Sequence, residues 1–332
     1  MKGFSMFSGC GGFDLALERM GIEIIGHSEI DKHADAVYSH HFTNRNYGDA
    51  TRLIPESLPD FDLLTGGFPC QSFSIAGKRG GFADTRGTLF FEIARIAAEK
   101  RPGYLLLENV RGLLSHDGGN TYKTILSALI QLGYDVQAMV LNSKNHGVPQ
   151  NRERIFIAGC LGGWGGREIF PLGENNEQVD DLQGQNTNTL RARYEGGQAV
   201  GSYVVEGKLN AQGNLSRVGT IGDKNQQAMR VYDSEGISQT ISSQGGGWGA
   251  KTGLYQTNTR IRRLTPIEAE RLQGFPDNWT KTGLFDGVEK EISDSQRYKM
   301  MGNAVTVNVV EYVLQRMFGS TPHFCQPTQG NQ

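Results

Sequence analysis

Cysteine is scarce in this 332-residue chain, and its spacing argues against two common structural roles. The four cysteines (Cys10, Cys70, Cys160 and Cys325) lie far apart and form no CxxC pair. Neither a zinc site nor a disulfide framework is therefore predicted, and a reducing compartment fits. The chain also lacks an apolar run of about 18 residues and an apolar signal segment at its start, so we expect a cytoplasmic protein without membrane contact.

An excess of charge of either sign is also missing. The chain has 33 Lys and Arg against 35 Asp and Glu, so any nucleic-acid site must come from local clustering of basic residues. A GxGxxG motif is absent, which disfavours a nicotinamide oxidoreductase. Glycine, in contrast, is abundant: its 45 residues are about twice the usual share, and many fall in the second half. The length allows two domains or one large domain.

Residues 3–30 have the pattern strand, glycine turn, helix, strand. The turn at 8–12 follows a short apolar run, and an acid, Glu29, ends the second strand. This βαβ opening is typical of nucleotide-binding sheets, in which glycines admit a cofactor and the acid binds ribose hydroxyls. The alternative is a tight turn without a ligand. A second acid, Asp49, is either another ligand or the N-cap of the segment that follows it.

The most distinctive stretch runs from Gly66 to Ser74. Cys70 comes directly after Pro69, between the apolar run 61–64 and a long polar loop. Proline fixes its own φ, so the cysteine begins a stiffly oriented segment, and the loop carries glycines and cations suited to a polyanion. A reactive thiol at the base of such a loop is what attack on a nucleobase needs. The alternative is a small packing cysteine.

Two further candidates lie at predicted strand ends. The apolar run 104–107 predicts a buried parallel strand, and Glu108 follows it at the sheet edge where open α/β folds bind ligands. Burial would raise the pKa of this carboxyl and let it donate a proton, unless it only caps the next turn. Arg152 and Arg154 are two residues apart, so a strand places both on one face, suited to a phosphate or a base carbonyl. The alternative is a solvated edge.

The composition changes between about 161 and 258, where Gly, Gln, Asn, Ser and Thr dominate and helical periodicity disappears. We expect a small β-rich or irregular domain there. Thr265 and Glu268 then predict a capping box with Pro266 at the first helical position. Residues 296–305 are predicted to form a polar turn. The last helix has one apolar face that needs a sheet to cover, and the tail after Gly319 is predicted to be disordered.

Together these stretches resemble the cytosine-C5 DNA methyltransferase family, in order and over most of the chain. Any one of them is weak evidence, whereas six or more in this order are specific. The matching segments are Phe7-Ser8-Gly9-Cys10-Gly11-Gly12, Glu29, Gly48-Asp49, Pro69-Cys70-Gln71, Glu108-Asn109-Val110, Gln150-Asn151-Arg152-Glu153-Arg154, Arg263-Leu264-Thr265, Gln273-Gly274-Phe275-Pro276 and Gly302-Asn303-Ala304-Val305.

The resemblance implies an α/β fold with a doubly wound, mostly parallel sheet, of the Rossmann-like S-adenosylmethionine methyltransferase type. It also implies a second, smaller target-recognition domain, with duplex DNA in the cleft between the two. The expected division is a discontinuous catalytic and cofactor-binding domain over 1–160 and 280–320, a target-recognition domain over 161–279, and a disordered tail over 321–332.

The resemblance also implies the roles of the catalytic residues. Cys70 would add to C6 of a flipped-out cytosine and so make C5 nucleophilic, because C5 alone is too weak a nucleophile to accept a methyl group. Glu108 would contact N3 and the exocyclic amine. Arg152 and Arg154 would hold O2 and the flanking phosphate and favour ionisation of the thiol.

In the implied cofactor site, Phe7 packs on the adenine of S-adenosylmethionine, Glu29 binds the ribose and Asp49 the adenine amine. The other cofactor positions are Gly9, Cys10, Gly12, Ile30, Ala50, Pro69, Leu89, Asn303, Ala304 and Val305. DNA contacts are expected from Gln71, Ser74, Lys78, Arg79, Arg86, Gln227, Arg230, Thr240, Gly245, Gly246 and Gly247. Of these, Gln227 would fill the space left by the flipped base and Arg230 would contact a guanine edge. No metal is expected.

The resemblance to one family member extends into the variable region, over residues 227–232, 236–241 and 245–255. It implies a short GC-rich palindrome with a guanine 5′ to the target cytosine. Two departures bear on that site: Ala76 replaces a serine and Gln244 a tyrosine of that member. A monomer of bacterial or phage origin is expected, and a cognate restriction endonuclease is an admissible partner. The alternatives are a tRNA methyltransferase of the same fold and a non-catalytic DNA-binding relative.

Overall fold

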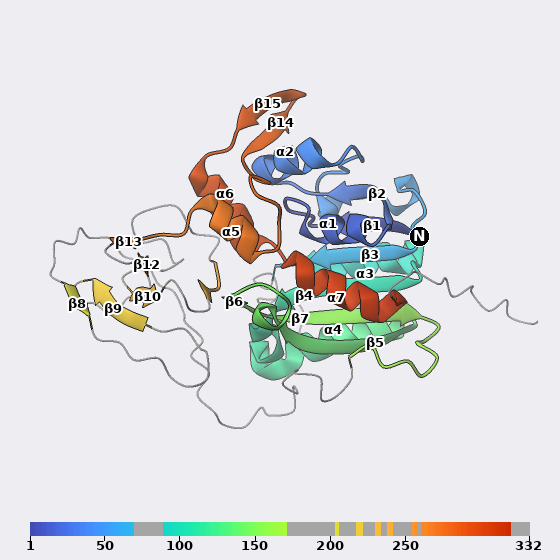
Figure 1. Ribbon diagram of the computed structural model, residues 1–332. Coiled ribbons are helices and arrows are strands. Elements are labelled where there is room, and N and C mark those ends of the chain that lie inside the picture. Colours follow the sequence, from blue (N-terminus) through green and yellow to red (C-terminus); the bar gives the residue numbers. More distant parts are fainter. Residues whose placement is uncertain are drawn as a thin grey trace, which may run out of the picture.

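The computed structural model describes residues 1–69, 89–170 and 260–319, together with the short segments 203–205, 217–221, 230–233, 238–241 and 254–257. Its centre is a six-stranded sheet in the order β2-β1-β3-β4-β7-β5 (Figure 1). The strands are β1 (Lys2–Met6), β2 (Glu23–Ser28), β3 (Leu63–Gly67), β4 (Tyr104–Val110), β5 (Tyr134–Asn142) and β7 (Glu153–Leu161). Neighbouring strands from β2 to β4 are parallel, and β7 runs antiparallel to both β4 and β5. The predicted α/β class with a mostly parallel sheet is confirmed.

Helices cover both faces of this sheet, with α1 and α7 on one side and α3 and α4 on the other (Figure 1). Side chains of the central strands alternate between two cores. Leu106 and Phe156 join the core beneath α1 and α7, whereas Leu105 and Ile157 join the core beneath α3 and α4. Burial on both faces explains why these strands are continuous apolar runs in the sequence. The helices are α1 (Gly12–Arg19), α2 (Lys32–His41), α3 (Leu89–Lys100), α4 (Asn120–Gln131), α5 (Pro266–Leu272), α6 (Asp294–Asn303) and α7 (Val307–Phe318).

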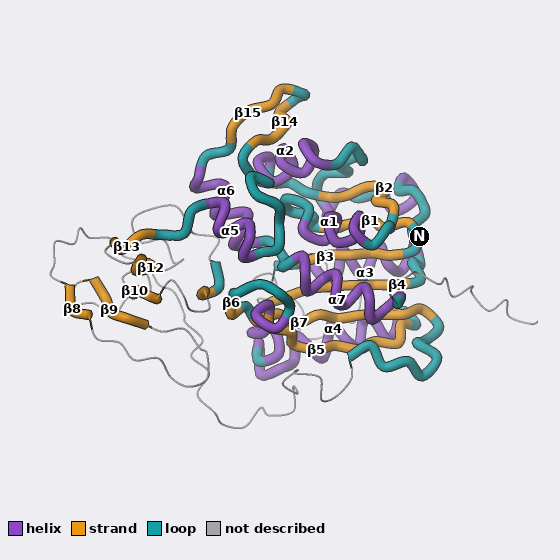
Figure 2. Tube along the Cα trace, viewed as in Figure 1, coloured by secondary structure: helices purple, strands orange, loops and turns teal. Residues whose placement is uncertain are grey.

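A second sheet has five short strands in the order β13-β12-β10-β9-β8 and lies beyond α5 and α6 from the first (Figure 2). Its strands are β8 (Tyr203–Val205), β9 (Arg217–Ile221), β10 (Arg230–Asp233), β12 (Leu254–Thr257) and β13 (Arg260–Arg262). Two smaller pairs complete the strands: β6 (Gln150–Asn151) with β11 (Ser238–Gln239), and β14 (Thr282–Phe285) with β15 (Val288–Glu291). Short 3₁₀ turns lie at Ala50–Arg52, Pro55–Ser57, Arg111–Leu114, His116–Gly119 and Ser143–Asn145.

Several local predictions are confirmed, and one is wrong. The capping box forms, since Thr265 Oγ1 accepts a hydrogen bond from the Glu268 backbone N–H and Glu268 Oε2 accepts one from Thr265 N. The last helix packs its apolar face into the core that contains α1. The polar turn predicted over 296–305 is instead mostly helix, because α6 spans Asp294–Asn303. Its polar Arg297 is buried in an ion pair with Glu270, which the local pattern did not reveal.

The segments next to the glycine-rich region also pack on the large sheet. Ile169, Phe170, Phe275 and Trp279 are buried in the same core as α7. The division into domains at 161 and 280 stays a prediction. The predicted disordered tail lies outside the described residues.

Candidate active site

The first glycine turn joins β1 to α1 and carries the predicted cofactor residues. Phe7, Gly9 and Gly11 have positive φ values of 55°, 56° and 92°, so the chain reverses sharply here. Gly9 N donates to Glu29 Oε2 at 2.8 Å, and Glu29 Oε1 accepts from the N–H groups of Ile30 and Asp31 at 2.8 and 2.7 Å. A carboxylate has about four acceptor positions, so this fixed side chain keeps one for a ligand hydroxyl.

The predicted motif Asn303-Ala304-Val305 lies against this turn. A Cβ on Gly12 would be 3.0 Å from Val305 Cγ1 and 3.2 Å from the Val305 carbonyl oxygen. The Cys10 carbonyl accepts a hydrogen bond from Trp279 Nε1 at 2.9 Å, which fixes the turn from a third segment. Burial strongly raises the pKa of the Cys10 thiol, so this cysteine stays neutral and is no nucleophile. Thus the structure brings the first and last predicted cofactor segments together.

Asp49 lies at the start of a 3₁₀ turn and acts as its N-cap. Its Oδ1 accepts from the backbone N–H and the hydroxyl of Thr51, at 2.9 and 2.8 Å. These hydrogen bonds lower the pKa of the Asp49 carboxyl. The capping alternative therefore holds, and binding of an adenine amine stays a prediction. Among the other predicted cofactor residues, Ile30 is 76 % exposed. Phe7 and Leu89 are half-buried, Ala50 is buried and Pro69 is exposed.

The catalytic candidates Glu108 and Arg154 face each other across β4 and β7. Glu108 Oε1 lies 3.1 Å from Arg154 Nε, and the two side chains are only 12 % and 16 % exposed. Burial raises the pKa of the Glu108 carboxyl, although both nearby arginines act to lower it. A carboxyl with a raised pKa is suited to hold and donate a proton. The sequence pattern places Glu108 after the strand. In the structure Glu108 is the fifth residue of β4 itself.

The chain that leads to Cys70 is tied to the strand that carries Glu108. Asn109 Nδ2 donates to the carbonyl of Phe68 at 2.8 Å, and both residues are buried. A Cβ on Gly67 would lie 3.3 Å from Glu108 Oε2, so glycine leaves the carboxylate accessible from β3. No separate role was predicted for Asn109, because its partner lies 41 residues away in the sequence. Cys70 lies outside the described residues, but its neighbour Pro69 is at this edge.

Arg152 is only 2 % exposed, and its guanidinium contacts the main chain of two other segments. Nη2 donates to the carbonyls of Ala304 and Gly302 at 2.6 and 3.2 Å, and Nη1 donates to the Ile241 carbonyl at 3.5 Å. Burial lowers the pKa of this guanidinium, and the positive Arg154 lowers it further. Contact of Arg152 with a base or a phosphate stays a prediction.

The predicted DNA-contacting residues are mostly not placed. Thr240 is described, and its hydroxyl donates to the Asn151 carbonyl at 2.7 Å. Arg230 begins β10. The residues that lie outside the described part of the chain are Gln71, Ser74, Lys78, Arg79, Arg86, Gln227, Gly245, Gly246 and Gly247, and the two departures Ala76 and Gln244 lie there too.

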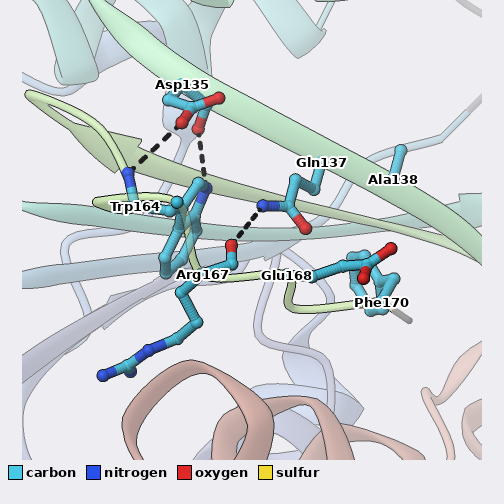
Figure 3. Close-up of a pocket in the computed structure, with 8 residues that line it drawn as sticks. Asp135, Gln137, Ala138, Trp164, Arg167, Glu168 and Phe170 are labelled. Atoms are coloured by element: carbon cyan, nitrogen blue, oxygen red, sulfur yellow. Dashed lines mark hydrogen bonds between the residues drawn. The ribbon is translucent and has the colours of Figure 1, made fainter.

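A surface hollow of about 460 Å³ lies elsewhere, at the start of β5 (Figure 3). Asp135 in this hollow pairs with Cys160, whereas Asn142 at the other end of β5 pairs with Glu153 near the catalytic candidates. Its polar groups bond to one another: Trp164 Nε1 donates to the Asp135 carbonyl at 3.0 Å, and Gln137 Nε2 to the Arg167 carbonyl at 2.9 Å. The hollow is therefore no candidate for the site.

Metal-binding clusters and membrane-spanning helices are both absent from the described ranges. No group of three His, Cys, Asp or Glu side chains there could hold a metal ion. No helix there is long and apolar enough to cross a membrane.

The fold is that of a Rossmann-like methyltransferase. A solved structure of the S. pombe Dnmt2 methyltransferase superposes with a TM-score of 0.64, over 96 % of this chain and 98 % of that one, at 17 % identity. At that identity the likeness shows the fold alone.

The sequence relationship is closer, and it shows the family. The model of the C-5 cytosine-specific DNA methylase family matches residues 1–319. The type II methyltransferase M.HhaI of Haemophilus parahaemolyticus is 38 % identical over 336 aligned residues, covering 98 % of this chain and 96 % of that protein. The orphan methyltransferase M.SPRI of Bacillus phage SPR is 31 % identical, covering 96 % and 97 %. The chain belongs to the C-5 cytosine-specific DNA methylase family, and it is a DNA (cytosine-5)-methyltransferase. The resemblance expected over residues 227–232, 236–241 and 245–255 is to the HhaI enzyme.

Proposed function

We propose that the enzyme methylates C5 of a cytosine flipped out of duplex DNA, through a covalent adduct of Cys70 at C6. The observation that carries this proposal is the largely buried pair of Glu108 and Arg154, 3.1 Å apart at the edge where the chain reaches Pro69. A pyrimidine placed against this pair would meet a proton donor for N3, a cation for O2 and, from Cys70, a nucleophile for C6. The few kcal/mol of lost base stacking would be offset by these contacts.

In this mechanism the Cys70 thiolate forms a bond to C6, and the electron pair of the C5–C6 double bond becomes available at C5. Glu108 shares its proton with N3, which balances the negative charge that the thiolate brings to the ring. Arg154, which contacts Glu108, stabilises the charge on O2. After the methyl group has been added, a base removes the C5 proton and the thiolate leaves C6, which restores the double bond.

We further propose S-adenosylmethionine as the methyl donor, bound at the first glycine turn. The residues present fit this group, because Glu29 is held by three backbone N–H groups and keeps an acceptor position for a ribose hydroxyl. The exposed Ile30 and half-buried Phe7 offer apolar surface for the adenine. When bound, S-adenosylmethionine supplies an electrophilic methyl group and leaves as S-adenosylhomocysteine.

The recognition site is proposed from the likeness to the HhaI enzyme. A short GC-rich palindrome would be recognised, with Arg230 bidentate to a guanine and Gln227 in the space of the flipped base. Relatives include enzymes named type II and one named orphan, so we propose a monomeric cytoplasmic enzyme of bacterial or phage origin that acts in a restriction-modification setting. A cognate endonuclease acting on the same site is the corresponding partner.

Bisulfite sequencing tests the reaction and the site together. Unmethylated plasmid and bulk tRNA are incubated separately with the purified protein and S-adenosylmethionine. Protected cytosines in one recurring DNA motif are expected, whereas protection in tRNA alone would replace the substrate. Cys70→Ser should bind DNA and cofactor without transferring a methyl group, and Arg230→Ala should relax discrimination at one base pair. Wild-type turnover in the first variant, or unchanged site preference in the second, would contradict the assigned role.

A further inference from the structure

Three segments far apart in the sequence meet at Arg152. The first is the strand region of Arg152 itself, where Ser143 N donates to the Arg152 carbonyl at 3.0 Å. The second is β11 with the two residues after it, Ser238–Ile241. The third is the end of α6 with the residues that follow it, Gly302–Val305. The guanidinium of Arg152 donates to carbonyls of the second and third segments.

The segment Ser238–Ile241 is attached to the catalytic strand through its main chain. Ser238 N donates to the Pro149 carbonyl at 2.6 Å, and β11 pairs in parallel with β6. Thr240 adds its hydroxyl bond to the Asn151 carbonyl. The Arg152 guanidinium adds a further hydrogen bond between the two segments, from Nη1 to the Ile241 carbonyl. Residues 238–241 thus lie in a fixed register with the sequence that carries Arg152 and Arg154.

The segment Gly302–Val305 is attached from the other side. The carbonyls of Gly302 and Ala304 lie at the C-terminal end of α6, where the helix dipole favours a cation. Thr306 secures the same segment, because its hydroxyl bonds with Ser143 Oγ and donates to Gln273 Oε1, both at 2.8 Å. Val305 then contacts the first glycine turn. A displacement at Arg152 is therefore passed to the predicted cofactor turn through packed main chain.

Arg152 and Arg154 make different contacts, which indicates different roles. Arg154 pairs with the Glu108 carboxylate and is 16 % exposed at the catalytic edge. Arg152 is buried, and both of its Nη atoms are engaged with carbonyls. A planar guanidinium directs its donors in a rigid fork to carbonyls of two segments, whereas a lysine ammonium is a compact point charge without this fork.

We propose that Arg152 is a positioning residue that couples DNA binding to cofactor binding, by locking Ser238–Ile241 to Gly302–Val305. The inference rests on the proposed function, in which the first segment belongs to the target-recognition region and the second borders the cofactor. A ligand that orders either segment then favours the arrangement that binds the other ligand. Such coupling is reciprocal and commonly amounts to about 5- to 150-fold in affinity.

Calorimetric titration with S-adenosylhomocysteine measures the coupling. It is carried out without DNA and with a duplex that contains the motif identified by bisulfite sequencing. In the wild type, DNA should tighten S-adenosylhomocysteine binding by about tenfold or more. In Arg152→Lys this factor should fall close to one, while S-adenosylhomocysteine alone binds within about twofold of the wild type. Turnover and the thermal midpoint are measured on the same preparations.

Two further variants separate coupling from folding. Arg297→Lys alters another buried arginine, which lies in the first half of α6 and whose Nη2 is 2.8 Å from Glu270 Oε1 of α5. This variant should keep the wild-type coupling. Thr306→Val removes the hydroxyl beneath Gly302–Val305 and should reduce the coupling by a smaller factor, which keeps the test valid if Arg152→Lys does not fold.

The possible results distinguish the two levels of the proposal. Full coupling in Arg152→Lys, or in Thr306→Val if the first variant does not fold, would overturn the inference and leave the proposed function intact. Absence of coupling in the wild type would also overturn it. A wild-type protein that binds neither S-adenosylhomocysteine nor DNA would instead refute the proposed function itself.

Discussion

Replacing Gly12 by alanine tests whether the close approach of the glycine turn to Val305 is needed for cofactor binding. The new Cβ would lie 3.0 Å from Val305 Cγ1, 3.2 Å from the Val305 carbonyl oxygen and 3.3 Å from Phe275 Cζ. One of the three contacts is with backbone, so α1 or the Val305 segment must shift. Adding a methyl group to a packed site costs about 1–3 kcal/mol, while alanine gains about 1 kcal/mol over glycine in a helix. The net destabilisation is therefore about 0–2 kcal/mol.

Gly103→Ala provides the matched control, because its Cβ would meet only the Asp62 carbonyl oxygen, at 3.7 Å. Calorimetric titration with S-adenosylhomocysteine and thermal unfolding are compared for both variants. If the strain is relieved by moving Val305 away from the turn, Gly12→Ala should bind the ligand about tenfold more weakly, at about 1.4 kcal/mol per tenfold. Gly103→Ala should match the wild type. Wild-type affinity together with a wild-type thermal midpoint in Gly12→Ala would refute the reasoning.

Three other predictions concern buried polar groups. Glu108→Gln should lower kcat by about 10²- to 10⁴-fold with unchanged S-adenosylhomocysteine affinity, and a wild-type kcat would exclude proton donation by this residue. Burial raises the pKa of the Asp14 carboxyl from 3.8 to about 6. The contribution of this carboxyl to the free energy of unfolding is therefore fully present below pH 3.8 and is lost as the pH rises through about 6. Denaturant unfolding should show Asp14→Asn gaining up to about 3 kcal/mol on the wild type from pH 4 to pH 7, and parallel pH profiles would contradict this. Neither amide atom of Gln150 has a hydrogen-bond partner among the described residues, and an unpaired buried amide costs about 1–3 kcal/mol. Gln150→Leu should therefore raise the thermal midpoint, and a lower midpoint would show that the amide is bonded.

The fold was predictable because its main signals are local. The run Leu105-Leu106-Leu107 alternates between two cores and is buried on both sides, which a continuous apolar strand indicates. The capping box at Thr265 depends on two residues three positions apart. The apolar face of α7 repeats at helical spacing over twelve residues. Patterns of this length can be recognised without knowledge of the rest of the chain.

The site was only partly predictable, because its geometry depends on distant partners. The sequence assigned Glu108 and Arg154 to one catalytic site, but it did not predict their 3.1 Å contact. The partners of Arg152 lie 89 and about 150 residues away, and they are carbonyls that any residue could supply. The helix α6 was missed for the same reason, since Arg297 is buried only because Glu270 faces it from α5.

The packing also bears on where the recognition region begins and ends. Composition sets its expected start at about 161, where glycine and polar residues become frequent, and the family resemblance sets its expected end at 279. Yet Ile169 and Phe170 are buried in the core of α7, and Trp279 donates to the Cys10 carbonyl in the first glycine turn. These contacts favour a recognition region confined to about residues 171–262. In that case the pairing of β11 with β6 and the bond from Arg152 to Ile241 lie at its junction with the catalytic strand. A region attached in this way would transmit its occupancy through Arg152 to the segment that borders the cofactor turn, which makes Arg152 the most informative position to alter.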